Sequence, residues 1–282
     1  MSTFAATPTS YVIPSRPQVL IDLTKELRNS SPNIDRISDL IKQDVALYSS
    51  VIATVNSAYY GFSTEITSIK HAVTILGIKQ VFNITRLAAL KNSLSAVGPM
   101  ERFWDTATEV ATICAELALK FTNFDSDEAY TLGMLHDIGI PLLILAKPGF
   151  KDFLRDLNGY SLTETYNKEM EHYGVSHYQL SAELVKKWKI SESIAEAVAL
   201  QPHYLKTFNE PADGSENKRL YLCLLLLARD ISDEYRHFWR IPETQEELLD
   251  LKPVLGFLGI SDFEYKDLKE DLVNKLTKQH SG

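Results

Sequence analysis

The stretch from Glu128 to Leu145, EAYTLGMLHDIGIPLLIL, most constrains the fold because it is apolar on both sides of one histidine and one aspartate. Its leucines and isoleucines recur at helical spacing. This predicts a buried helix and, after a break at Gly139 and Pro141, a second short one. His136 and Asp137 are therefore expected near the end of a buried helix. An unpaired buried carboxylate is very costly, so Asp137 needs a partner.

Two kinds of partner can satisfy Asp137: a divalent metal ion, or a hydrogen-bond network supplied by other helices. Imidazole together with carboxylate is an acceptable ligand pair for several first-row metals, so His136 and Asp137 could reach one ion. A His-Asp dipeptide is nevertheless common by chance, and it is usually structural. The residues of this stretch alone leave both alternatives open.

Composition limits the class of protein. The 282 residues suggest one large domain or two closely packed ones, and 45% apolar residues are ample for a core. No apolar run reaches the length of a membrane span, and the N-terminus lacks the basic and apolar regions of a signal peptide. Cys114 and Cys223 have no CxxC partner, which predicts buried thiols in a reducing cytoplasm. The net charge of −8 argues against nucleic acid or an anionic membrane as the main partner.

Capping residues and apolar spacing predict helices throughout the chain, so the expected fold class is all-α. Residues 1–12 are expected to be a flexible tail. Gly98-Pro99 is the best boundary between an N-terminal helical lobe, 13–98, and a second lobe with C-terminal helices, 99–282. Expected N-caps include Asp44, Ser68, Ser176 and Ser191. The expected helices include Val19–Asn29, Ile34–Ile41, Val81–Leu94, Glu101–Phe121, Leu220–Tyr235 and Thr244–Leu251, with a polar surface loop over Thr207–Lys218.

The sequence around the pair, L-x-x-L-H-D-I-G, resembles the HD superfamily of metal-dependent phosphohydrolases. Residues 49–77, SSVIATVNSAYYGFSTEITSIKHAVTILG, resemble the N-terminal half of the HDOD family, a divergent branch of that superfamily. The sequence Trp188-Lys-Ile-Ser is similar to the family's W-x-L-P. The resemblance extends from about Ile13 to Ala228. It implies a multi-helical, HD-domain-like fold with two closely packed helical lobes, in a bacterial protein of signal transduction.

The superfamily's metal set consists of an early histidine, the His-Asp pair and a late aspartate. Together these bind one or two divalent ions, which activate water and clamp a phosphate. His136 and Asp137 match the pair. The early histidine is expected just after Phe103-Trp104, where this chain has Thr106, a poor ligand. Glu109, one helical turn further on, and Asp105 are the candidate substitutes for it.

The late aspartate of the resemblance is displaced as well. Arg229 occupies the expected place, and Asp230 is offset by one residue, about 100° round a helix. An arginine in that place can form an ion pair with Asp137 and so substitute for a cation. The resemblance therefore implies a metal set from which two of the four ligands are missing or displaced.

Three more histidines fall where relatives of the HD-GYP type carry extra ligands: His172, His177 and His203. The simplest explanation for each is a hydrogen-bonded histidine near a helix end. Together with His136 they could still form an imidazole-rich pocket. The divalent metals to consider for such a site are manganese, magnesium, iron, nickel and zinc.

Two functions from different classes follow from the resemblance. The first is a non-catalytic HDOD-type signalling or regulatory module with a degenerate metal site. It would need no cofactor and would act through contacts with a protein partner. The alternative is a metal-dependent phosphohydrolase that acts on a nucleotide or cyclic dinucleotide. The incomplete ligand set favours the first, because a site without most of its ligands holds a catalytic ion poorly.

Overall fold

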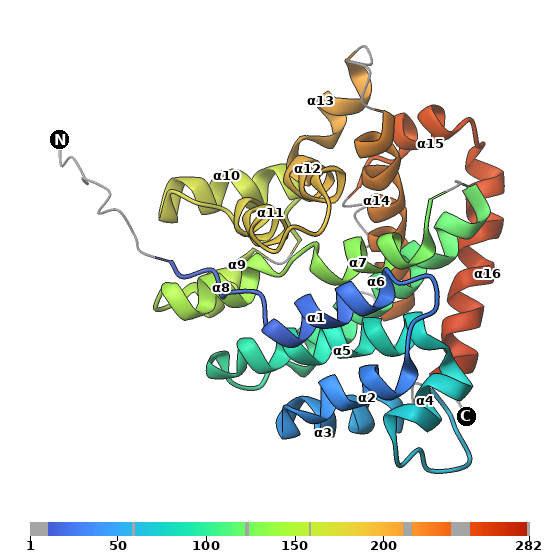
Figure 1. The fold of residues 1–282 in the computed structure, drawn as a ribbon. Coiled ribbons are helices and arrows are strands. Elements are labelled where there is room, and N and C mark those ends of the chain that lie inside the picture. Colours follow the sequence, from blue (N-terminus) through green and yellow to red (C-terminus); the bar gives the residue numbers. More distant parts are fainter. Residues whose placement is uncertain are drawn as a thin grey trace. The chain divides into compact units, whose positions relative to one another are not determined.

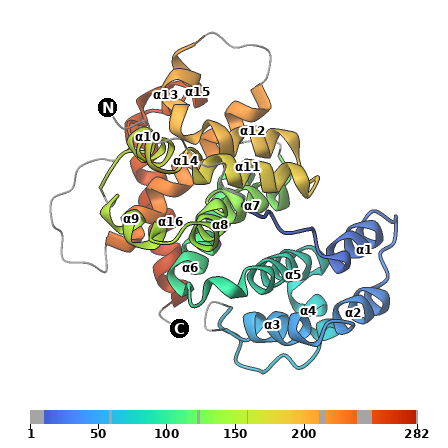
Figure 2. The same ribbon diagram turned by 90° about the vertical axis from the view of Figure 1, so that its left-hand side faces the viewer.

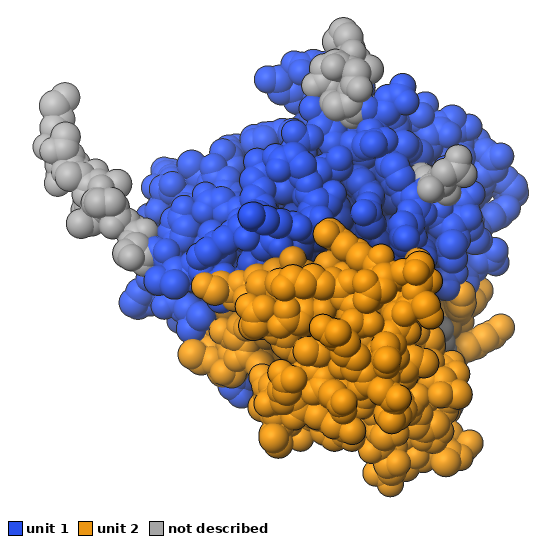
Figure 3. Space-filling view, viewed as in Figure 1, with its two compact units in different colours: residues 1–14, 99–273 blue, residues 15–98, 274–282 orange. Residues whose placement is uncertain are grey.

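The computed structural model describes residues 11–57, 60–121, 124–157, 159–210, 216–237 and 249–280. These residues form α-helices and short 3-10 helices joined by turns, and they contain no strand (Figure 1). The fold is therefore all-α, as the capping residues and apolar spacing predict. The chain divides into two compact units, which are coloured separately in Figure 3.

One unit comprises residues 15–98 and 274–282. Its first five helices, seen together in Figure 2, each expose one side and bury the other. Helix α5 contacts α1, α3 and α4, and α2 contacts α1, α3 and α4. The elements are α1 (Gln18–Leu27), α2 (Ile34–Lys42), α3 (Val45–Val55), α4 (Ile69–Leu76), α5 (Ile78–Ser93) and the 3-10 helix η1 (Ser95–Val97).

Local side-chain bonds set the starts of these helices. The side-chain oxygens of Asn33, Asp44 and Ser68 each accept a hydrogen bond from a backbone N–H in the first turn of α2, α3 and α4. The loop between α3 and α4 is held by Asn56, whose side chain bonds both the N–H and the carbonyl of Ile66. Asn56, which belongs to the stretch 49–77 that carries the family resemblance, thus has a structural role here.

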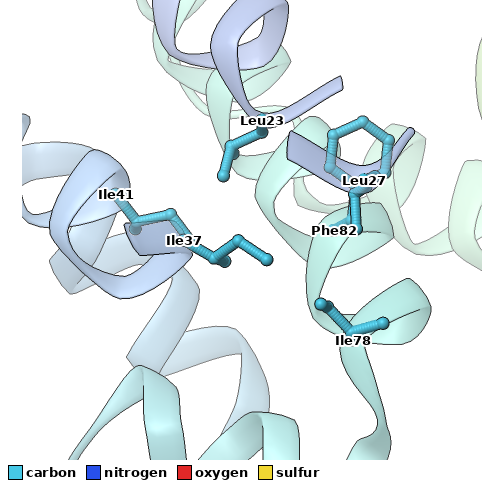
Figure 4. A pocket seen from close by; sticks show the side chains of 6 residues that line it. All are labelled: Leu23, Leu27, Ile37, Ile41, Ile78 and Phe82. Atoms are coloured by element: carbon cyan, nitrogen blue, oxygen red, sulfur yellow. The ribbon is translucent and has the colours of Figure 1, made fainter. Parts of the chain in front are cut away.

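A small apolar hollow lies where α1, α2 and α5 of this unit meet (Figure 4). It offers no polar side chain, and so no group for chemistry or for binding a charged ligand. Its lining consists of Leu23, Leu27, Ile37, Ile41, Ile78 and Phe82.

The second unit comprises residues 1–14 and 99–273 and carries the His-Asp pair. Helix α7 packs on α6 and α14, while α11 packs on α8 and α12. The elements are α6 (Glu101–Phe121), α7 (Ser126–Leu135), α8 (Gly139–Ala146), α9 (Phe150–Asp156), α10 (Leu162–Tyr173), α11 (His177–Lys187), α12 (Glu192–Leu200), η2 (Gln201–His203), α13 (Tyr204–Asn209), α14 (Glu216–His237), α15 (Lys252–Leu258) and α16 (Asp262–His280), of which the residues after Val273 belong to the other unit.

The two helices around the His-Asp pair belong to the core of this unit. A Cβ atom at Gly133 would lie 2.5 Å from the Cα of Ala111, so the absence of a side chain lets α7 approach α6 closely.

By length and composition, Ser126–Ala146 could cross a membrane, contrary to the expectation that no run is long enough. Of its most apolar part, 72% is buried inside the protein, as in a core helix of a folded domain.

Several predicted boundaries are wrong. Helix α5 begins at Ile78 rather than Val81, and the side chain of Ser191 makes no capping bond. The polar stretch 207–218 is not a single loop, because α13 continues to Asn209 and α14 begins at Glu216. Residues 1–10 of the predicted tail lie outside the described residues, as does most of the helix predicted over 244–251.

Candidate functional site

Asp137 lies in the short turn between α7 and α8, and a glycine brings α11 against that turn. A Cβ atom at Gly139 would lie only 2.0 Å from the backbone oxygen of His177. The N–H of Gly139 donates to the Ser181 hydroxyl at 2.8 Å, and this hydroxyl donates to the His177 oxygen at 2.8 Å. The glycine of the H-D-I-G motif therefore places His177 beside Asp137.

The carboxylate of Asp137 is paired with Arg229 from α14. Nη1 of Arg229 lies 2.9 Å from both carboxylate oxygens and 3.1 Å from Oε1 of Gln201. Burial alone would raise the pKa of Asp137, but the charge of Arg229 and the rings of His136 and His177 hold it well below its usual value. Burial likewise opposes the charge on Arg229 and would lower its pKa. The negative charge of Asp137 has the larger effect, so the pKa of Arg229 is raised.

His136 contributes one nitrogen to the Asp137 centre, the cluster of linked side chains around the Asp137 carboxylate. Its Nδ1 lies 2.6 Å from the backbone oxygen of Gly133. A carbonyl oxygen can only accept, so Nδ1 carries the proton of that bond. The other nitrogen, Nε2, lies 3.1 Å from Oδ2 of Asp137. The ring is 3% exposed, so the α7 backbone and Asp137 together set its orientation.

His177 links Asp137 to a second buried carboxylate. Its Nε2 lies 3.5 Å from Oδ1 of Asp137, and its Nδ1 lies 2.7 Å from Oε1 of Glu169. The backbone N–H of His177 donates to the other oxygen of Glu169 at 2.9 Å. Burial opposes the charge on His177, but the carboxylates of Glu169 and Asp137 outweigh burial and raise its pKa to about 9. A protonated His177 thus stands between two carboxylates.

This raised pKa predicts a loss of stability at high pH. The unfolded chain titrates near the ordinary histidine pKa of about 6.5, so the contribution of His177 is complete below that pH and disappears as the pH rises through 9. Urea unfolding at pH 6 and pH 9.5 should show a loss of roughly 1–3 kcal/mol in the wild type. His177→Gln should abolish most of it. The control is His172→Gln, because His172 is exposed. If His172→Gln reduced the pH-dependent loss of stability as much as His177→Gln does, the loss could not be assigned to His177.

The structure does not bring the other candidate residues to Asp137 as ligands. The hydroxyl of Thr106 donates to the carbonyl of Arg102, on its own helix. Glu109 is buried and accepts hydrogen bonds from Ser232 and Arg236, so it belongs to a separate ion pair between α6 and α14.

Asp230 is engaged with α16 instead. It accepts a hydrogen bond from the Tyr265 hydroxyl and pairs with Lys269 at 2.8 Å. The remaining two candidate histidines contact aromatic rings. His172 stacks on Phe153 at 5.1 Å between ring centroids, and the exposed His203 lies edge-on to Tyr166 at 4.8 Å. The imidazole-rich pocket is therefore reduced to His136 and His177.

Sequence reasoning missed two members of the centre, Glu169 and Gln201. Glu169 had a usable signal, because it follows Leu162 and Thr165 on the buried stripe of α10, where a charged residue needs a partner. Gln201 is fully buried and donates from Nε2 to the carbonyls of His136 and Val198. No spacing in the sequence marks it, since its role depends on the packing of α12 against α14.

These residues do not fit the metal site that the superfamily implies. Nε2 of both His136 and His177 faces the carboxylate of Asp137, yet Nη1 of Arg229 already contacts both oxygens of that carboxylate. A divalent ion bound there would lie beside a guanidinium, and the two cations would repel. In the part of the chain that the structure describes, no group of three or more His, Cys, Asp or Glu side chains is arranged to hold a metal ion.

Comparison with known proteins gives a consistent fold. A sequence profile of the HDOD domain matches residues 13–204. Among solved structures, an HDOD domain protein of unknown function from Geobacter sulfurreducens covers 96% of this chain and 92% of its own at 22% identity, with a TM-score of 0.67. A protein of Shewanella amazonensis SB2B, whose name assigns it provisionally to the phosphohydrolases, covers 95% and 91% at 24% identity, with a TM-score of 0.65.

A curated relative comes from Treponema pallidum (strain Nichols) and has no assigned function. It is 23% identical over 189 residues, which are 66% of this chain and 37% of that protein. The chain thus spans a little over a third of the length of this relative. At these identities the solved structures establish the fold and leave activity to be argued from the residues of this chain.

Proposed function

Because the chain belongs to the HDOD family, we propose that it is a regulatory module that acts through contact with a protein partner and does not hydrolyse phosphate esters. One observation carries this proposal: a single nitrogen of Arg229 lies 2.9 Å from both oxygens of Asp137. The guanidinium supplies the positive charge that the carboxylate needs in a partly buried place. It therefore takes over the structural task of a metal ion.

An arginine cannot take over the chemical task of that ion. Metal-assisted hydrolysis requires an ion that binds water, lowers the pKa of that water and shares charge with the phosphoryl oxygens. A guanidinium has only N–H donors and offers no coordination position for a water nucleophile. The residues around Asp137 form a chain of partners, Glu169, His177, Asp137 and Arg229, whose effect is to hold the turn between α7 and α8 to α10, α11 and α14.

A metal-dependent phosphohydrolase acting on a nucleotide or cyclic dinucleotide is the alternative function. One geometric observation favours it, since Nε2 of His136 and Nε2 of His177 both face the carboxylate of Asp137. Two imidazoles and a carboxylate are an acceptable set for a transition metal. This function would require Arg229 to leave the carboxylate and His177 to lose its proton when the ion binds.

The two functions predict opposite results in one experiment. We expect the purified protein, supplied in turn with manganese, magnesium, iron, nickel and zinc, to retain no stoichiometric metal after desalting. We also expect it to hydrolyse p-nitrophenyl phosphate and cyclic dinucleotides no faster than Asp137→Asn, because no ion activates water. Elemental analysis and product release measure the two quantities.

Asp152→Asn is the matched control, since Asp152 is exposed and its ion-pair partner is Arg155, on its own helix. It separates an effect of the Asp137 centre from a general effect of losing one carboxylate. Turnover that needs both the metal and Asp137, and that persists in Asp152→Asn, would refute the regulatory function and support the phosphohydrolase.

A further inference from the structure

Among the residues that the structure describes, Arg229 finds hydrogen-bond partners for one of its three nitrogens. Nη1 makes all of its hydrogen bonds, to Asp137 and Gln201. Within the described ranges, neither Nε nor Nη2 has a hydrogen-bond partner in the protein. Neither atom is completely shielded from solvent. These two nitrogens therefore reach the surface, in agreement with a side chain that is 20% exposed.

The exposed edge has the geometry of a receptor for an oxyanion. The N–H of Nε and one N–H of Nη2 point the same way in a planar guanidinium, so together they match the two oxygens of a carboxylate or a phosphate. The opposite edge is held by Asp137 and by Gln201, which is itself fixed on the carbonyls of His136 and Val198. Little side-chain freedom remains to be lost when an anion binds.

We propose that this edge of Arg229 binds an acidic side chain, Asp or Glu, of a protein partner. The inference rests on the proposed function and names the chemistry of the contact. The charges around Arg229 favour a carboxylate over a phosphoryl group. Asp137 already contacts the same guanidinium, and Asp233, one turn further along α14, adds a negative field at Arg229. These two carboxylates offset the single positive charge of Arg229, so the edge lacks the excess positive charge that would favour a dianionic phosphate over a monoanion.

The test follows the arginine Nε–H signals of the ¹⁵N-labelled full chain by NMR, with acetate as the probe. The chain has ten arginines, and Arg229→Lys assigns the signal of Arg229 by its loss. We expect that signal to shift saturably with sodium acetate, with half-saturation at roughly 10–100 mM for one charge-assisted pair. Sodium chloride at equal ionic strength should not reproduce the shift. Arg155, which is exposed and paired with Asp152, should respond equally to both salts.

Two results would overturn the inference. One is an Arg229 signal that responds alike to acetate and chloride, or to neither. The other is a saturable shift with inorganic phosphate at lower concentration than with acetate, which would assign the edge to phosphoryl groups. The NMR titration and the test of the proposed function can fail separately. Metal-dependent turnover would refute the proposed function whatever the acetate titration shows. A missing acetate shift refutes only the carboxylate contact.

Discussion

Replacing Asp137 with alanine is expected to lower the free energy of unfolding by about 3–5 kcal/mol, the range for removing one partner of a buried ion pair. The substitution leaves Arg229 without its counterion and His177 without one of its two carboxylates. Both are largely buried, so water compensates only in part. Urea unfolding at pH 7, monitored by the three tryptophans, measures the loss.

Asp152→Ala is the control for this prediction. Asp152 is 77% exposed and pairs with Arg155 in the same helix, so its loss should cost less than about 1 kcal/mol. The double variant Asp137→Ala, Arg229→Ala should be more stable than the sum of the two single changes implies, because neither charge then remains unpaired. If Asp137→Ala costs no more than Asp152→Ala, the centre contributes no stability and the structural role of Arg229 is wrong.

The second large effect concerns Gly139. Gly139→Ala is expected to destabilise the protein by about 3 kcal/mol or more, because its Cβ would lie 2.0 Å from the backbone oxygen of His177. Backbone cannot move aside as a flexible side chain can. Either α8 or α11 must therefore shift, and the contact between His177 and Asp137 weakens with it. Thermal unfolding followed by circular dichroism measures the change.

Gly256→Ala provides the matched control, because Gly256 also lies in a helix and a Cβ there meets nothing within 4 Å. Alanine has the higher helix propensity, so this variant should equal the wild type or gain up to about 1 kcal/mol. A Gly139→Ala protein as stable as Gly256→Ala would show that α8 and α11 are not as close as the structure places them.

The helical fold was predictable because its signals are local. The caps at Asn33, Asp44 and Ser68 bond backbone groups only three residues away, and the apolar spacing of each helix lies within that helix. The same local rules failed where other contacts dominate. Ser191 makes no capping bond although its residue type favours one, and α5 begins one turn before the predicted start.

The candidate site was predictable only where the family resemblance supplied distant partners. Asp137 and Arg229 are 92 residues apart, and it was the resemblance, not local spacing, that suggested they would meet. Only the tertiary structure identified Glu169 and Gln201 as members, and only it separated Glu109 and Asp230 into other ion pairs.

There is a physical reason why local sequence patterns show that a partner is needed but do not identify it. A buried carboxylate makes a partner necessary, so the residues of the chain alone determine that Asp137 must be compensated. Which cation compensates it depends on how α7, α11 and α14 pack, and that packing is set by close contacts such as Gly139 on His177 and Gly133 on Ala111. These contacts join residues far apart in the chain, so no local pattern encodes them. The sequence thus determined that Asp137 needs a countercharge, and the packing decided that Arg229 supplies it.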